Sequence, residues 1–154
     1  MKATPFLAGL LAFASFALMG AAQAQGASPV VGTVANLSGV LVVRTAEGAT
    51  RLLAVDSQIR QGDTLTTESR AYAQLKFSDG AELVLQPQSM LVVTRYSYDA
   101  AQPQRDGIEL GLAQGGFRST AGAVGQRSKD ATVINTPMGA LKGNASMVVS
   151  LQQP

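Results

Sequence analysis

The stretch Tyr72–Leu85, YAQLKFSDGAELVL, decides the fold class. In its first half the apolar residues Leu75 and Phe77 alternate with polar ones, and the second half alternates in the same way. Apolar residues at every second position lie on one face of a β-strand, so each half predicts a half-buried strand. Asp79 and Gly80 stand between the halves. This pair is typical of a two-residue hairpin turn, whose central residues both need positive φ.

Further short runs of β-branched and apolar residues lie on both sides of this hairpin, separated by turn residues. They predict strands at Val30–Leu37, Val40–Arg44, Thr50–Val55, Thr64–Thr67, Met90–Tyr98, Ile108–Leu112, Ala131–Asn135 and Ser146–Leu151. Gln58–Arg60 fits either a strand or a turn. No window of about a dozen residues keeps a helical period. We therefore expect a single all-β domain, and the pattern leaves a sandwich, a barrel and a solenoid open because it does not reveal strand order.

The composition of the 154-residue chain excludes several classes of function. It contains no Cys, His or Trp, so we expect no disulfide, no zinc site of the usual kind and no Ser-His-Asp or Cys-His nucleophile. We expect no catalytic residue, cofactor or metal. Asp63 and Asp79 are carboxylates beside glycine, where an Asp side chain usually bonds the local backbone. A formal charge of +2 gives no reason to expect a nucleic-acid partner.

Residues 1–24 have the three parts of a secretory signal peptide. Lys2 supplies the positive start, an apolar run follows, and Ala22-Gln23-Ala24 matches a small-x-small cleavage site. We expect cleavage between Ala24 and Gln25, which leaves a domain over residues 25–154 in the periplasm or outside the cell. The alternative is a retained membrane anchor, but the apolar run is shorter than the ~20 residues of a spanning helix. We expect no stable membrane span after cleavage.

Five segments resemble the FecR-domain family in order and spacing. The segments are Asn36–Arg44, Gly62–Thr67 with its G-D-x-hydrophobic-x-T element, Ala73–Leu83 around Asp-Gly, Leu110–Phe117 with L-x-x-G, and Val133–Pro137 with Thr-Pro. Together they span roughly residues 31–149. The resemblance implies that residues 25–154 form a β-rich extracytoplasmic module, solenoid- or sandwich-like.

The sequence departs from that family in one segment. The family often has hydrophobic-Arg-Gly-Thr after Thr-Pro, whereas this chain has Leu141-Lys142-Gly143-Asn144. A lysine does not provide the planar bidentate fork of an arginine. Longer relatives signal from an outer-membrane receptor to a cytoplasmic sigma factor, through a cytoplasmic segment and a membrane helix. The sequence shows neither, so we do not expect that function here.

The leading hypothesis is a non-enzymatic, exported protein-interaction module of the bacterial cell envelope, accessory to signalling or assembly. Its partner would be an unidentified envelope protein. An exposed strand edge can pair with a partner strand through backbone bonds, and two polar loops, Asp99–Gly107 and Ser119–Asp130, could add selectivity. Arg105 and Arg127 are the candidate contacts in these loops.

The alternative hypothesis is an envelope polysaccharide-binding module. Tyr96 and Tyr98 would share a face of the predicted strand Met90–Tyr98, and two aromatic rings could stack on a sugar. The competing interpretation is that these tyrosines close one end of the core or cover an edge. A two-carboxylate glycosidase is a distant third, because no spacing of carboxylates points to it.

Overall fold

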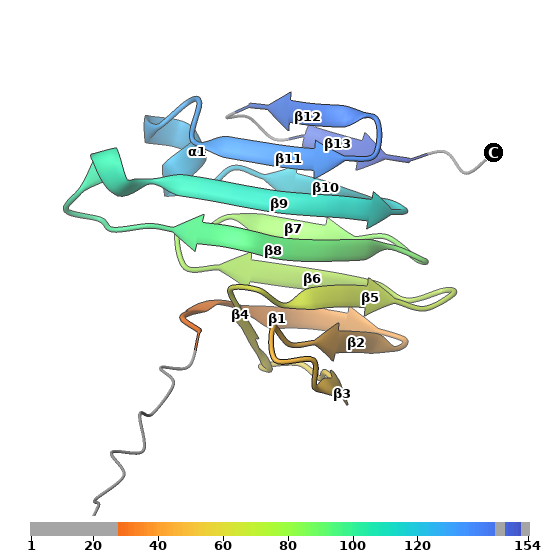
Figure 1. The fold of residues 1–154 in the computed structure, drawn as a ribbon. Helices are drawn as coiled ribbons and strands as arrows, with labels where there is room; N and C mark the ends of the chain where they lie inside the picture. Colours follow the sequence, from red (N-terminus) through yellow and green to blue (C-terminus); the bar gives the residue numbers. More distant parts are fainter. Residues whose placement is uncertain (1–27, 144–146, 152–154) are drawn as a thin grey trace, which may run out of the picture.

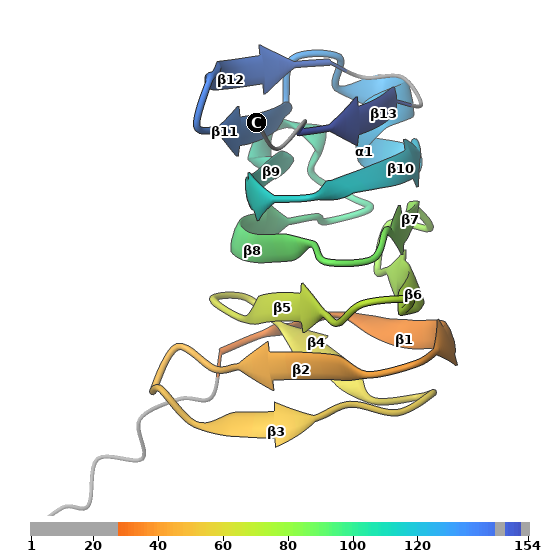
Figure 2. The same cartoon turned by 90° about the vertical axis from the view of Figure 1, so that its right-hand side faces the viewer.

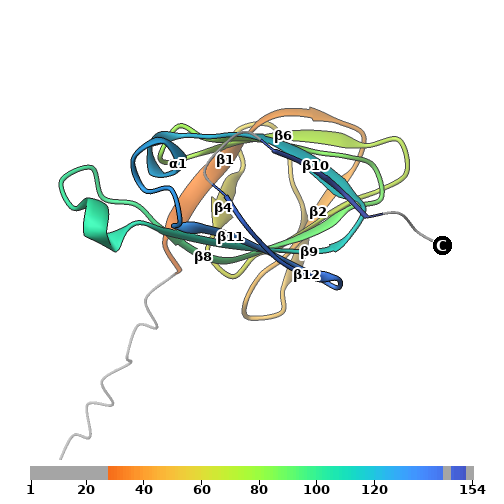
Figure 3. The same ribbon diagram turned by 90° about the horizontal axis from the view of Figure 1, so that it is seen from above.

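The structure is a computed structural model that describes residues 28–143 and 147–151, arranged as two β-sheets that face each other (Figure 3). The signal peptide and the Ala24–Gln25 cleavage site lie outside the described residues. Sheet A contains β1 (Val30–Ser38), β4 (Gln58–Arg60), β6 (Tyr72–Phe77), β7 (Glu82–Leu85), β10 (Gly116–Thr120) and β13 (Met147–Ser150). Sheet B contains β2 (Leu41–Arg44), β3 (Thr50–Leu52), β5 (Thr64–Thr67), β8 (Met90–Ser97), β9 (Gly107–Gln114), β11 (Thr132–Thr136) and β12 (Gly139–Lys142).

The strand order shows that the chain adds strands from one end of the two sheets to the other. Sheet A runs β13-β10-β7-β6-β1-β4 and sheet B runs β12-β11-β9-β8-β5-β2-β3. The chain crosses repeatedly between the sheets, from β1–β4 at one end to β11–β13 at the other (Figures 1 and 2). The all-β prediction is confirmed, and both sheets are open. The facing sheets resemble a sandwich, while the progressive winding resembles a solenoid.

The core lies between the two inner faces and follows the alternation seen in the sequence. Leu75, Phe77, Leu83 and Leu85 are all buried, as predicted for the central hairpin. The largest fully buried side chain is that of Phe117, on β10. Removing each such side chain from water contributes about 1.5–3 kcal/mol, so the two inner faces hold the sheets together.

Several elements differ from the sequence-based prediction. Gln58–Arg60 is the strand β4, and its Ile59 is fully buried. Strands β10 and β12 were not predicted, and each begins at a glycine, which is depleted in strands. The expected loop Ser119–Asp130 contains the short helix α1 (Ala123–Arg127), and the loop after β8 contains a 3-10 turn, η1 (Pro103–Arg105).

The turn between β6 and β7 also differs in type from the prediction. Gly80 has φ +84°, but Asp79 is not among the residues with positive φ. The Gly80 N–H donates to the Phe77 carbonyl at 3.0 Å, and the Phe77 N–H donates to the Ala81 carbonyl at 2.9 Å. These bonds describe a type I turn followed by a glycine in the left-handed region, a wider hairpin connection than the two-residue turn.

Candidate functional site

The two predicted interaction loops lie side by side at one end of the strands (Figures 1 and 3). The first loop joins β8 to β9 and carries η1, and it extends beyond the sheets in Figure 3. The second joins β10 to β11 and carries α1. The sheet topology explains why the two loops lie together. Because β11 pairs parallel with β9, both strands start at the same end of sheet B, and each loop leads into one of them.

Arg127 connects the two loops. Its Nε and Nη2 donate to the Asp106 carboxylate at 2.8 and 2.7 Å, a bidentate pair. The same guanidinium donates to the carbonyls of Asp99 and Ala100, and it lies over the Tyr98 ring at 5.1 Å. The Arg127 bond lowers the pKa of Asp106 below its usual value. Arg127 is thus an internal clamp between the loops as well as a surface cation.

Arg105 occupies a different environment. It ends the 3-10 turn η1, and its side chain is exposed. The two candidate interaction residues therefore lie in the same loop pair, but Arg127 is engaged by that pair whereas Arg105 points to solvent.

Asp79 ties the β6–β7 turn to α1 and β8. Its Oδ1 accepts hydrogen bonds from the Ala81 N–H at 3.1 Å and from the Tyr96 hydroxyl, and its Oδ2 accepts from the Val124 N–H at 3.2 Å. Gly122 packs so closely that an added Cβ would lie 2.7 Å from Oδ2. Asp79 as a whole is 7% exposed. It is committed to holding three elements in place, which leaves it poorly suited to acid–base chemistry.

Tyr96 is an internal residue, and its predicted pairing with Tyr98 as a sugar platform was wrong. A β-bulge between Val93 and Arg95 reverses the alternation of β8, so Tyr96 points inward. The residue is 6% exposed, and its ring stacks on that of Phe77 with centroids 4.8 Å apart. Burial, followed by the bond to Asp79, raises the pKa of Tyr96 well above its usual value. The competing interpretation, that these tyrosines close the core, describes both, because Tyr96 is buried and the partly buried Tyr98 packs against the core.

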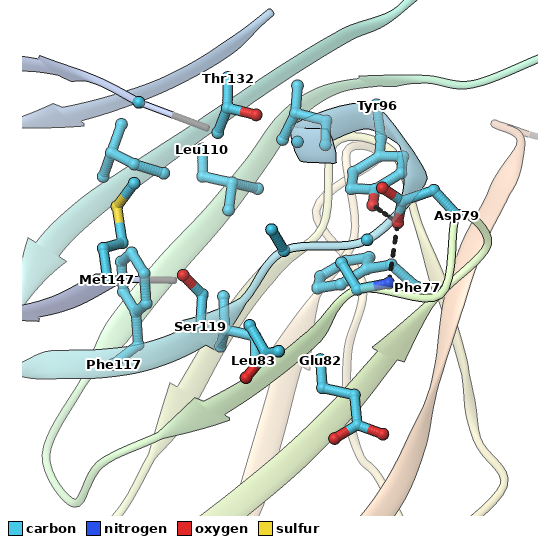
Figure 4. A pocket seen from close by; sticks show the side chains of 18 residues that line it. Phe77, Asp79, Glu82, Leu83, Tyr96, Leu110, Phe117, Ser119, Thr132 and Met147 are labelled. Carbon is cyan, nitrogen blue, oxygen red and sulfur yellow. Dashed lines mark hydrogen bonds between the residues drawn. The ribbon is translucent and has the colours of Figure 1, made fainter. Parts of the chain in front are cut away.

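A small cavity of about 50 Å³ lies between the sheets near α1 (Figure 4). Phe117 and Leu110 line it from the two sheets, Met147 from β13, and the Asp79–Tyr96 pair lies at one side. Its walls are mostly apolar side chains, and it is far smaller than the ~300–1,000 Å³ of drug-sized ligand sites.

The strands β12 and β13 form one end of the two sheets. Within the part of the chain that the structure describes, each pairs with a neighbour on one side only, β12 with β11 and β13 with β10. Three large apolar side chains are exposed here: Met138 at 91%, Val148 at 65% and Leu141 at 45%. We call β12, β13 and these three side chains the C-terminal edge. Lys142, which replaces the family's arginine, lies at the end of β12, while Asn144 lies outside the described residues.

Other classes of site find no support in residues 28–143 and 147–151. This part of the chain contains no group of three or more acidic side chains able to hold a metal ion. It also contains no helix that is long and apolar enough to cross a membrane.

A family model described as "FecR protein" matches residues 63–149. The chain belongs to the FecR family. The match begins at Asp63, so the FecR-like segment predicted at Asn36–Arg44 lies outside it. No curated protein matches the chain. A solved structure described as a cell surface anchoring domain is 25% identical, with a TM-score of 0.40, and the alignment covers 41% of this chain and 83% of that one.

The FecR motif residues serve the fold. The buried Asp63 accepts a hydrogen bond from the Arg60 N–H at 2.9 Å, and burial raises its pKa despite that bond. Thr67 accepts from the Ser89 N–H at 3.0 Å. The hydroxyl of Thr136, from the Thr-Pro element, donates to the Gly139 carbonyl at 2.8 Å and shapes the β11–β12 turn. These three motif residues therefore make local and cross-strand bonds that hold the fold.

Proposed function

We propose that the chain is an exported, non-enzymatic interaction module of the cell envelope, which binds an extended segment of a partner protein along its C-terminal edge. Membership of the FecR family and the signal-peptide pattern of residues 1–24 support the envelope location. The observation that carries the binding mode is the C-terminal edge itself, where two open strands coincide with exposed apolar side chains.

The chemistry of an open strand edge favours a strand as its partner. Backbone N–H and C=O groups along the outer sides of β12 and β13 can pair with an added strand, and side chains at alternate positions then give selectivity. Met138, at the tip of the β11–β12 hairpin, offers apolar contact beside that edge. The second of the two clamped loops leads into β11, the neighbour of β12, and the exposed Arg105 of the first loop is the proposed charged contact.

Photo-crosslinking from the edge tests this function in the intact envelope. A benzoylphenylalanine in place of Met138 should crosslink to one defined protein, whereas the same group in place of Leu52 should not. Leu52 is the matched control because it is 72% exposed at the opposite end, on β3. Leu141→Lys should remove the Met138 crosslink, since a lysine on an edge strand opposes pairing.

Three results would contradict the proposed binding mode. The first is equal crosslinking from Met138 and Leu52, and the second is a crosslink that survives Leu141→Lys. The third is a crosslink from Met138 to a second copy of this chain. That result would show that the edge binds another copy and not a different protein. Turnover of an envelope polymer by the purified protein would refute the non-enzymatic assignment.

A further inference from the structure

The outer face of sheet A carries an open groove of about 210 Å³ around Tyr72. It is lined by Asn36, Leu37, Ser38, Tyr72, Gln74 and Val84. Tyr72 begins β6 and is 52% exposed, far more than the buried Tyr96. The groove thus offers what the predicted Tyr96–Tyr98 pair does not, an aromatic ring facing solvent from a rigid sheet.

Strand register places two amide side chains beside that ring. Asn36 pairs across the strands with Gln74, and Ser38 pairs with Tyr72. Directly opposed side chains on one face of an antiparallel pair lie about 4.5–5.5 Å apart. The groove therefore presents two adjacent rows, one of carboxamides and one of a hydroxyl with an aromatic ring.

A second β-bulge accounts for the position of Asn36. Val34 points into the core, and an unbroken strand would turn Asn36 inward as well. The register shift between Val34 and Asn36 inserts one residue, so Asn36 faces outward and Leu37 packs against the core. The bulge thereby moves a hydrogen-bonding side chain onto the outer face beside Tyr72.

The amide contacts leave both a donor and an acceptor available to a ligand. Asn36 Oδ1 accepts from the Leu37 N–H at 2.9 Å, so its NH₂ group keeps its donors. Gln74 Nε2 donates to Glu82 at 3.4 Å, so its Oε1 can accept. A neighbouring pair of donor and acceptor matches vicinal hydroxyls, which donate and accept at once.

We propose that this groove is a subsite for one pyranose ring of a neutral polysaccharide, with the ring face on Tyr72 and its hydroxyls on Asn36 and Gln74. None of the six lining side chains is charged. The charged neighbours are of opposite sign, Glu82 bonded to Gln74 and Arg118 paired with Val84 across the strands, so the groove favours a neutral ligand. The groove is smaller than the ~300–1,000 Å³ of drug-sized ligand sites, which suits one sugar unit of a longer chain. This site is separate from the C-terminal edge and does not depend on the proposed protein partner.

Nuclear magnetic resonance titration of the purified exported protein tests the subsite. The probes are cellohexaose, a neutral glucan, and chitohexaose, a neutral N-acetylated glycan; oligogalacturonate is the anionic comparator. We expect at least one neutral probe to shift the backbone amides of Asn36, Ser38, Tyr72 and Gln74, and oligogalacturonate not to. Comparison of the two neutral probes distinguishes a glucan from an amino-sugar polymer.

Substitutions of Tyr72 distinguish the loss of ring stacking from a loss of folding. Tyr72→Ala should weaken binding at least about tenfold, equivalent to about 1.4 kcal/mol, whereas Tyr72→Phe should retain it. Leu52→Ala, another exposed residue on a different sheet, should bind as the unaltered protein does. The proposal is overturned if neither neutral hexasaccharide shifts the groove at millimolar concentration, if oligogalacturonate binds there equally well, or if Tyr72→Ala binds normally.

Discussion

Gly80 holds the β6–β7 turn by its backbone conformation and not by its packing. Its φ is +84°, and an added Cβ would meet nothing within 4 Å. Gly80→Val should therefore lower the free energy of unfolding by about 1–3 kcal/mol through backbone strain. Gly80→Asn is the control, because asparagine tolerates this region and should cost less. Urea denaturation of the unaltered protein, Gly80→Val and Gly80→Asn measures these free energies. Equal stability of all three proteins would contradict the prediction.

Tyr96 is expected to make stability depend on alkaline pH. Its pKa is raised in the folded protein, whereas an unfolded tyrosine ionises near pH 10. The stabilisation it provides is therefore fully present below about pH 10 and is lost as the pH rises above that value, because only the unfolded chain then releases the proton. Tyr96→Phe should flatten this dependence and cost about 1–3 kcal/mol at neutral pH through the lost bond to Asp79.

Chemical denaturation between neutral and alkaline pH measures both effects of Tyr96→Phe. Tyr72→Phe is the matched control, because Tyr72 is exposed and lies on the opposite face of sheet A from the Asp79 contact. An unchanged alkaline slope in Tyr96→Phe would show that another group is responsible.

At the scale of the elements, the contact between the two loops depends on the side chain of Arg127. Arg127 bonds Asp106 and two carbonyls of the other loop, so Arg127→Ala should lower the melting temperature and speed amide exchange over residues 99–107. Arg105 is exposed, so Arg105→Ala should change the free energy of unfolding by no more than about ±0.5 kcal/mol. Equal melting temperatures and exchange rates for the two variants would exclude the clamp.

The loop clamp should also open in acid. Because the pKa of Asp106 is lowered in the folded protein, its contribution to stability is present above the unfolded value of about 3.9 and is lost as the pH falls through the folded value. Amide exchange in residues 99–107 should therefore accelerate below about pH 4, relative to the intrinsic rate. Asp106→Asn should lack this acid step, and a step that persists in that variant would assign it to another carboxylate.

The alternation of apolar residues was enough to predict most strands, because a half-buried strand has to place every second residue in the core. Strand β4 was ambiguous because Ile59 is its one apolar residue. The bulges in β1 and β8 could not be predicted, since they depend on pairing with distant strands, and they decide where Asn36 and Tyr96 point. Tyr72 did carry a signal, being an aromatic residue in the polar phase of an alternating strand.

At the scale of the whole molecule, the mature chain is expected to begin at Gln25. The apolar run followed by Ala22-Gln23-Ala24 predicts cleavage after Ala24. Intact-mass measurement of the protein recovered from the envelope should give the mass of residues 25–154. A recovered species that still contains Lys2 would contradict both the cleavage and the exported state.

The order of strands in the two sheets has a consequence for how the chain would fold during the proposed export. Strands β1 to β8 pair among themselves at one end, and β9 to β13 are added beyond them nearly in the order of the chain. A polypeptide that emerges from a secretion channel with its N-terminus first can therefore bury its early layers while the later ones are still in transit. We expect the nascent protein to fold vectorially, with only the most recently added layer exposing apolar surface at any moment.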